Sequence, residues 1–407
     1  MKYIKRDLER RISQLSSEYA AVMLIGPRQV GKTTLLEHMT TGQREFVTLD
    51  DFNERKLAKT DPEMFLATHS KPILIDEVQY APELFSYIKM DIDKGAKAGT
   101  YWLTGSQAFH MMELAQETLA GRVAVVHVSS ISQHELYGTA ENKPFVPELS
   151  LVKNRAKNMK SCSVGGMFER IFNGSMPGHV SGKFSDRTAF YSSYFQTYID
   201  RDITDIAKNV DKFAMADFIR ACACRCGCVL NIHDVAADAG ISENTAKRWL
   251  EILERSEVIF FLRPYSNNLL KRTIKTPKMY FFDTGLVAYL TQYETPATLM
   301  SGALNGAIFE NYVVAELRKS YLNSGKTPLV WYYRDKDKRE IDFILEQDGM
   351  LYPIEIKKSA NPGSKIAETF KLLDKASLKC GQGAVVCMKN NVSAISKDAL
   401  IVPAWAV

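Results

Sequence analysis

The residues best suited to chemistry form a candidate phosphate-binding loop near the N-terminus. The segment Gly26 to Thr33, GPRQVGKT, matches the pattern G-x-x-x-x-G-K-[ST] at every fixed position. A continuous apolar run, Ala20 to Ile25, precedes the loop, and Leu35 and Leu36 follow it at positions suited to a buried helix face. The loop is therefore predicted to join a buried parallel strand to a helix.

Each position of this loop has a physical role in holding a nucleotide. Gly26 and Gly31 permit a tight turn whose amide groups point at phosphate oxygens, and the helix dipole favours the same anion. Lys32 would neutralise the β- and γ-phosphates, and Thr33 would offer its hydroxyl oxygen to Mg²⁺. The predicted nucleotide-binding residues are Gly26, Pro27, Arg28, Gln29, Val30, Gly31, Lys32, Thr33 and Thr34.

Two acidic residues end a second apolar run, Pro72 to Glu77 (PILIDE), as in a Walker B strand. Asp76 is expected to hold Mg²⁺ through water, and Glu77 to orient or deprotonate the attacking water. A solvated acidic turn after a buried strand is the alternative, and the phosphate-binding loop upstream makes it less favoured.

Two further polar positions are candidates for contact with the γ-phosphate. Ser106 or Gln107 follows a third apolar run, Tyr101 to Thr104, and either could sense that phosphate or cap a helix. Arg122 precedes a fourth run, Val123 to Val128. Its guanidinium could reach a γ-phosphate in its own subunit or a neighbour's, or it could be a surface residue.

Four segments, GPRQVGKTTL, ILIDEVQ, LTGSQ and LAGR, occur in that order. They resemble the bacterial and archaeal AAA-type ATPases that carry a C-terminal domain of unknown function. The resemblance continues over nearly the whole chain and implies ATP as the nucleotide. No guanine-specific Asn-Lys-x-Asp follows the Walker B run.

Strands that alternate with helical stretches predict a doubly wound α/β domain with a parallel sheet over residues 1–138. Its ligand should lie at the carboxyl ends of the strands. A linker and a helical segment are expected over residues 139–205. The linker is predicted to be solvated, with nucleic-acid contact as the alternative, because basic residues cluster there without acids: Lys153, Arg155, Lys157 and Lys160.

A winged-helix-like domain is predicted over residues 206–294. Two helices, Ile232 to Ala239 and Glu243 to Arg255, should be followed by strands at Val258 to Leu262 and Lys278 to Phe282. Residues 258–278 contain five basic residues and no acid, which is consistent with DNA contact. Acidic residues in the second helix equally allow a protein-binding role.

Four cysteines at alternate positions resemble a metal cluster at first sight. Their C-x-C-x-C-x-C spacing differs from the usual paired zinc spacing, and on a helix it separates them into two pairs four residues apart. Buried free cysteines are the favoured interpretation of Cys222, Cys224, Cys226 and Cys228.

The last part of the chain, residues 295–407, resembles the PD-(D/E)xK nuclease core, an α/β restriction-endonuclease-like fold. A helix with Glu310 precedes a strand with Asp342 and a strand with Glu355 and Lys357. Asp342 and Glu355 are predicted to bind Mg²⁺, Lys357 to activate water, and Glu310 to assist. A salt-bridged hairpin surface is the alternative.

Composition leaves several classes of function open. The chain has 407 residues and a net charge of +5, which alone does not identify a nucleic-acid partner. No apolar run of transmembrane length occurs, and the seven cysteines favour a reducing cytoplasm. The hypotheses are a Mg²⁺-dependent ATPase switch with DNA as a candidate ligand, an ATP-regulated nuclease, and a non-hydrolysing ATP-binding scaffold. A homo-oligomer or a protein partner is compatible with each.

Overall fold

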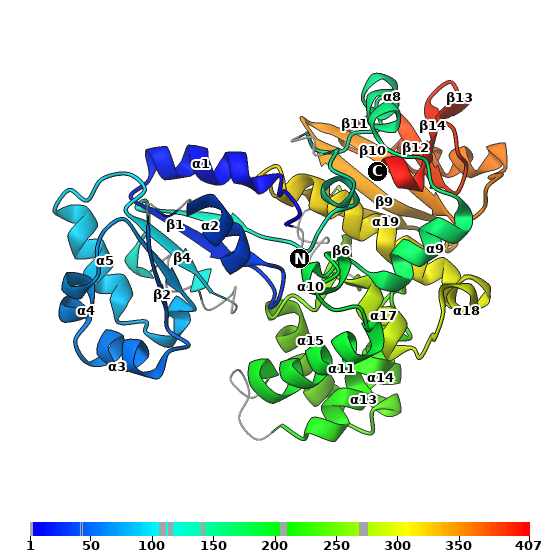
Figure 1. Ribbon diagram of the computed structural model, residues 1–407. Helices are drawn as coiled ribbons and strands as arrows, with labels where there is room; N and C mark the ends of the chain where they lie inside the picture. The colour runs from blue at the N-terminus through cyan, green and yellow to red at the C-terminus, as the bar shows by residue number, and fades with distance from the viewer. Residues whose placement is uncertain are drawn as a thin grey trace.

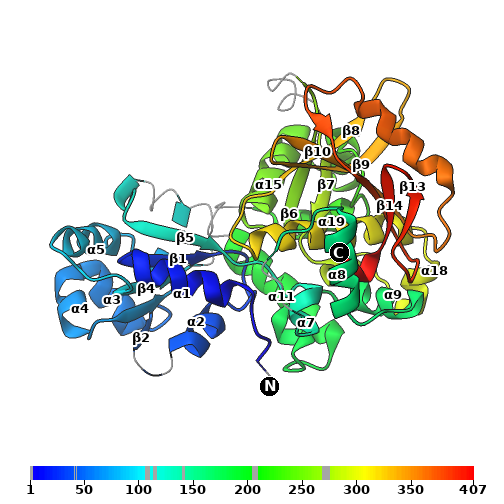
Figure 2. The same ribbon diagram turned by 90° about the horizontal axis from the view of Figure 1, so that it is seen from above.

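The computed structural model of the protein describes residues 3–40, 42, 44–105, 111–112, 117–139, 143–203, 210–267 and 276–407. Its N-terminal part and the remainder of the chain form two lobes (Figure 1). Figure 2, seen from above, shows the same separation, with the β1–β5 sheet in one lobe and the C-terminal strands in the other.

A parallel five-stranded sheet forms the N-terminal lobe, with the strand order β2-β3-β4-β1-β5. The strands are β1 (Ala21–Ile25), β2 (Glu45–Thr48), β3 (Ile73–Asp76), β4 (Tyr101–Thr104) and β5 (Val123–His127). The helices are α1 (Leu8–Glu18), α2 (Lys32–Thr40), α3 (Phe52–Thr60), α4 (Pro62–Thr68) and α5 (Leu84–Asp93). The predicted doubly wound α/β architecture is confirmed here.

The alternation of side chains along β1 explains why both faces of this sheet need helices. Val22 and Leu24 pack in a cluster with residues of α1 and α2, whereas Met23 and Ile25 pack in a second cluster with residues of α4 and α5. Strand β2 was not predicted, because it is a four-residue edge strand with a single buried side chain.

Helix α7 (Gln133–Leu136) follows β5, and helix α8 (Leu149–Asn158) lies within the segment predicted to be a solvated linker. Lys153, Lys157 and Lys160 are exposed, as predicted, but Arg155 is not. The Arg155 side chain is buried and donates to His134 Nε2 at 2.7 Å and to the Lys143 carbonyl at 2.6 Å. The helix was not recognised in the sequence because basic residues line its exposed face. Its other face, including Val152, packs into the core.

Helices and one hairpin make up the middle of the chain. The helices are α9 (Val164–Asn173), α10 (Pro177–Val180), α11 (Arg187–Thr197), α13 (Lys212–Ala223), α14 (Ile232–Asp238), α15 (Glu243–Arg255), α17 (Thr284–Leu290) and α18 (Pro296–Ser301), with a π-helix at Tyr198–Ile203. Strands β6 (Ile259–Pro264) and β7 (Lys278–Phe281) pair antiparallel. The predicted order of two helices and a hairpin is present; the basic residues Lys271, Arg272 and Lys275 lie outside the described residues.

The β6–β7 hairpin belongs to a nine-stranded sheet that extends through the C-terminal part of the chain. Its other strands are β8 (Leu329–Arg334), β9 (Glu340–Gln347), β10 (Met350–Lys357), β11 (Lys379–Cys380), β12 (Gly383–Cys387), β13 (Ser393–Ser396) and β14 (Ala399–Pro403). Strand β6 pairs with β8 through Arg263–Trp331 and Pro264–Tyr332. The sheet therefore crosses the boundary predicted between residues 294 and 295.

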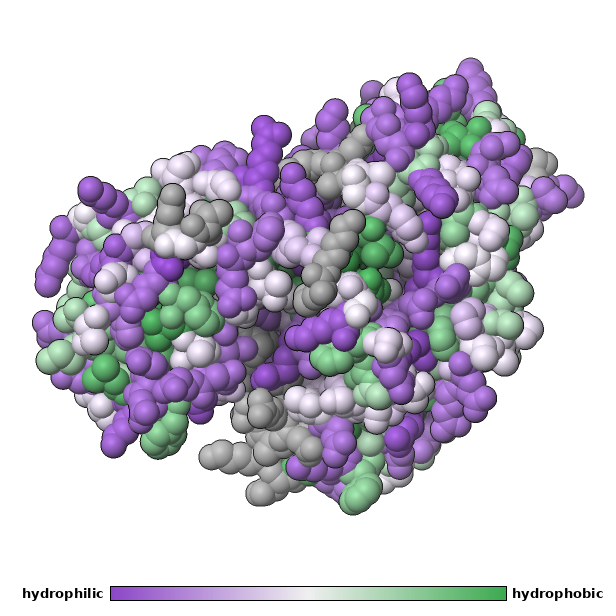
Figure 3. Space-filling view, viewed as in Figure 1, coloured by the Kyte–Doolittle hydropathy of each residue, from purple (hydrophilic) through white to green (hydrophobic). Residues whose placement is uncertain are grey.

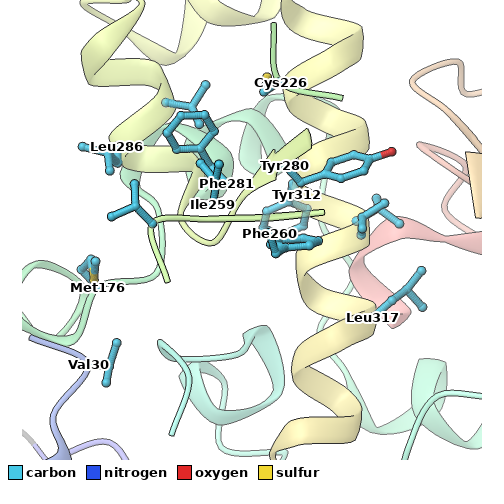
Figure 4. Close-up of a cluster of buried hydrophobic side chains, with 14 of the residues drawn as sticks. Val30, Met176, Cys226, Ile259, Phe260, Tyr280, Phe281, Leu286, Tyr312 and Leu317 are labelled. Carbon is cyan, nitrogen blue, oxygen red and sulfur yellow. The ribbon is translucent and has the colours of Figure 1, made fainter. Parts of the chain in front are cut away.

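Helix α19 (Asn305–Leu322) lies against this sheet, and one hydrophobic cluster runs from it to the N-terminal lobe. Figure 4 shows the cluster, with Val30 near Met176, and with Tyr280 and Phe260 beside the helix that carries Tyr312. Hydrophilic residues dominate the outer face seen in Figure 3. Within the described part of the chain, none of the helices is long and apolar enough to cross a bilayer.

Candidate functional site

The phosphate-binding loop connects β1 to α2, as the sequence predicts. Gly26 has φ +146°, and a Cβ at this position would lie 2.2 Å from the Val128 carbonyl oxygen. Gly31 and Gln29 have φ values of +86° and +63°. The loop needs glycine at position 26 because its backbone passes directly over the end of β5.

Lys32 is buried at the start of α2 and folds back over the loop. Its Nζ donates to the carbonyl oxygens of Gly26 at 2.8 Å and Pro27 at 2.7 Å. Burial lowers the pKa of Lys32 to about 8, although nearby Glu77 opposes this change. The ammonium group is thus held where the terminal phosphates of a nucleotide would replace its carbonyl partners.

Three threonines surround the Walker B aspartate. Thr33 Oγ1 donates to Asp76 Oδ1 at 2.7 Å, and Thr104 Oγ1 donates to the same oxygen. Thr48 Oγ1 lies 3.4 Å from Asp76 Oδ2. Burial raises the pKa of Asp76, and the two close hydroxyls counteract it. A hydroxyl beside a carboxylate is an oxygen donor set that suits Mg²⁺.

Glu77 follows Asp76 in a left-handed conformation, with φ +55°. Its amide lies 3.4 Å from Thr104 Oγ1, and its carboxylate accepts a hydrogen bond from Gln79 Nε2. This backbone conformation is uncommon for a residue with a side chain and turns Glu77 out of the strand direction. Glu77 consequently lines the same cavity as Lys32 and Thr33.

A cavity of 740 Å³ lies between the loop and a roof formed by residues 177–194. A Cβ on Gly31 would be 3.6 Å from Pro177 Cγ, so the roof approaches the loop closely. The roof side chains that face the cavity include Lys183, Phe184, Asp186, Phe190 and Tyr194. These residues were not predicted, because only the folded chain brings a segment 150 residues downstream over the loop.

The nine predicted nucleotide-binding positions lie together in the loop and the start of α2, but Arg122 does not join them. Arg122 precedes β5, so it lies at the amino ends of the parallel strands, whereas the loop lies at their carboxyl ends, and its Nε pairs with Asp93 Oδ1 at 2.6 Å. This placement argues against the expected contact with a γ-phosphate in the same subunit. Ser106 and Gln107 lie outside the described residues, and Thr104, at the end of β4, contacts Asp76.

The predicted nuclease-like residues converge on a second site. Lys357 Nζ lies 2.9 Å from Asp342 Oδ2 and 2.7 Å from Glu355 Oε2. Glu310 faces the same cluster but pairs with Lys278, at 2.9 Å. Among the residues described, no three His, Cys, Asp or Glu side chains are arranged to hold a metal ion. The expected Mg²⁺ ligands are engaged by lysines instead.

The four alternating cysteines are free thiols of two kinds. Cys222 and Cys226 are buried, which raises the pKa of both thiols, whereas Cys224 and Cys228 are exposed. Helix α13 ends at Ala223, so only Cys222 lies on a helix, and the predicted burial holds for Cys222 and Cys226 but not for Cys224 and Cys228.

Family models match three parts of the chain. Residues 18–137 match an AAA domain, residues 166–297 a domain of unknown function (DUF8612), and residues 305–407 another domain of unknown function (DUF4143). The first match covers β1 to α7 and contains Lys32, Thr33, Asp76 and Glu77. This part of the chain is an AAA-type P-loop ATPase domain.

Similar whole proteins are also found. Uncharacterized proteins of Mycobacterium bovis and Mycobacterium tuberculosis are each 26% identical over 402 residues, covering 98% of this chain and 83% of theirs. A Walker-type ATPase of Pyrococcus abyssi aligns with 71% of this chain and 96% of its own at 14% identity, with a TM-score of 0.45.

Proposed function

We propose that the protein is a Mg²⁺-dependent ATPase that couples its nucleotide state to the middle and C-terminal parts of the chain. The observation that carries the proposal is the convergence of Lys32, Thr33 and Glu77 on one cavity, with Asp76 hydrogen-bonded to Thr33 behind it. Its volume, 740 Å³, falls within the roughly 300–1,000 Å³ common for small-molecule sites.

Each of these residues has a separate role in the proposed hydrolysis. Lys32 binds the terminal phosphates and spreads their charge, while Thr33 and Asp76 would hold Mg²⁺, which supplies charge neutralisation when bound. Glu77 orients the attacking water and accepts its proton. Thr104 fixes Asp76 through one hydroxyl hydrogen bond. Among these residues, Glu77 is assigned a role in hydrolysis and not in nucleotide binding.

The roof supports coupling between the nucleotide and the remainder of the protein. It contributes Phe184 and Phe190, on which a nucleoside can pack, and Lys183, which can meet a phosphate. A second contact lies nearby: His127, at the end of β5, pairs with Glu257 in the turn between α15 and β6. Closing the cavity around ATP would therefore act on α10, α11 and that turn.

The same proposal includes the folds and the ligand of the middle and C-terminal parts of the chain. We assign a winged-helix-like unit to α13, α14, α15 and the β6–β7 hairpin, and a nuclease-like fold to residues 295–407. DNA is the proposed macromolecular ligand, on the ground of the four basic residues in 258–275, since Lys278 is buried in ion pairs. DNA cleavage is not favoured, because lysines engage the carboxylates that cleavage would need.

Phosphate release and nucleotide binding, each measured with Mg²⁺ or with EDTA, test the proposal. Lys32→Ala should abolish saturable ATP binding, because it removes the phosphate's cation. Glu77→Gln should keep binding but lower the turnover rate about 100-fold or more. Lys59→Ala, at an exposed helical lysine, is the matched control and should behave as wild type.

An unchanged rate in Glu77→Gln would exclude the proposed chemistry and leave ATP binding without turnover by this route. The same assay repeated with duplex DNA tests the proposed ligand. A turnover rate that rises with DNA would support it, and an identical rate together with no DNA binding would remove DNA from the proposal.

A further inference from the structure

An ion-pair cluster lies where β7, α19, β9 and β10 meet. It contains four carboxylates and two lysines, of which one lysine, Lys278, comes from the β6–β7 hairpin: Glu310, Glu340, Asp342, Glu355, Lys278 and Lys357. The sequence predicts a divalent cation for three of these carboxylates. Lys278 was not part of that prediction, because it lies outside the nuclease-like pattern.

Lys278 occupies the position that a cation would take in this cluster. Only 4% of its side chain is exposed. Its Nζ lies 2.9 Å from Glu310 Oε1, pairs with Glu340 Oε1, and lies 4.0 Å from Asp342 Oδ1. Carboxylate oxygens from helix α19 and strand β9 thus surround one ammonium group, as they would surround a hard metal ion.

Several oxygens of the cluster have further partners. Asp342 Oδ2 accepts from Lys357 Nζ at 2.9 Å and from the Ile356 amide at 2.8 Å. Glu355 Oε1 accepts from Thr369 Oγ1 at 2.9 Å, and Tyr280 donates at 2.7 Å to Glu310 Oε1, the oxygen that also pairs with Lys278. An incoming ion would have to displace these contacts to use the same oxygens.

Cationic side chains of the protein itself offset most of the negative charge of the cluster. Four carboxylates face Lys278 and Lys357, and Arg334 Nε lies 3.8 Å from Glu340 Oε2. A divalent ion added to this set would leave surplus positive charge in a buried site.

We propose that Lys278 is a tethered cation that takes the place of a divalent metal ion in the C-terminal fold. The cluster then joins the β6–β7 hairpin to α19 and β9, and the C-terminal part of the chain works as a metal-independent module without cleavage activity. This role is separate from the ATPase proposal and can fail while that proposal stands.

Removing the ammonium should uncover a cation site. In Lys278→Met the stem of the side chain is kept, but Glu310, Glu340 and Asp342 lose their shared positive charge. Buried carboxylates left in this way bind a divalent cation or take up protons. The variant should therefore bind one more Mn²⁺ than wild type.

Electron paramagnetic resonance of free Mn²⁺, with the full chain and without nucleotide, measures this difference. Any Mn²⁺ at the phosphate-binding loop is common to all variants. We expect one additional saturable site in Lys278→Met, at least tenfold tighter than any in wild type at this cluster, and its loss in Lys278→Met combined with Asp342→Asn. Equal stoichiometry in wild type and folded Lys278→Met would overturn the proposal.

If Lys278→Met does not fold, Asp342→Asn alone still tests the proposal. Its Mn²⁺ stoichiometry should equal that of wild type, because wild type holds no metal at the cluster. A site lost in Asp342→Asn would contradict the proposal. Plasmid DNA with Mn²⁺ gives a second readout: wild type should leave it intact, and cleavage that disappears in Asp342→Asn would also contradict it.

Discussion

Lys32 is a buried cation whose protonation should respond to nucleotide. Burial lowers its pKa to about 8 in the free protein, and negatively charged phosphates at its Nζ would raise it again. At pH 8.5, ATP binding should therefore take up a large part of a proton. Because only the protonated form attracts the phosphates, affinity should fall by up to about tenfold per pH unit above this pKa.

Calorimetry at pH 8.5 in buffers of different ionisation enthalpy measures the proton uptake. The same titrations at pH 7 are the control, since Lys32 is then already charged and contributes little uptake. A binding enthalpy that is independent of the buffer at pH 8.5 would show that the loop lysine stays charged without nucleotide.

Among the elements, the roof of the nucleotide cavity depends on a buried aspartate. Asp283 caps α17 by accepting from the Leu286 amide at 2.8 Å, and it also accepts from the Tyr191 hydroxyl of α11 at 2.8 Å. Its other oxygen accepts from the amide and hydroxyl of Ser175, just before α10, at 2.7 and 2.9 Å. One carboxylate thus positions three elements.

Asp283→Ala should destabilise this arrangement and the nucleotide cavity with it. Four donors lose a charged acceptor in a buried site, and the free energy of unfolding should fall by about 3–5 kcal/mol. Urea denaturation measures the loss, and ATP affinity should weaken in parallel. Asp217→Ala, which breaks an exposed pair with Arg220, is the control and should cost less than about 1 kcal/mol.

The elements themselves were largely predictable, and the contacts between them were not. Strand β4 and helix α15 have the predicted bounds, because apolar runs and helical periodicity are local properties of the sequence. The burial of Arg155 and the position of Lys278 depend on partners outside their own helix or strand. Phe184 in the roof could not be predicted for the same reason. The loop residues could be predicted, because their spacing along the sequence is what phosphate binding requires.

At the scale of the whole molecule, α7 connects the phosphate-binding loop to the far lobe. Arg6 donates to the Val30 carbonyl at 3.0 Å and pairs with Glu135 of α7 at 3.0 Å. Gln133, in the same helix, donates from its side chain to the Val407 carbonyl at 2.7 Å and accepts from Tyr312 of α19 at 3.1 Å. A rearrangement of the loop therefore has a continuous hydrogen-bonded route to α19 and the end of the chain.

Gln133→Ala should break this route while leaving the loop intact. In wild type, a non-hydrolysable ATP analogue should slow amide hydrogen exchange in α19 and β14 several-fold, and in Gln133→Ala this distant protection should be lost although the loop is still protected. Removing the buried amide should also cost about 1–2 kcal/mol of stability. Gln14→Ala, at an exposed glutamine of α1, controls for loss of a surface amide. Equal protection of α19 in wild type and in Gln133→Ala would mean that the effect of nucleotide binding reaches the far lobe through the roof instead.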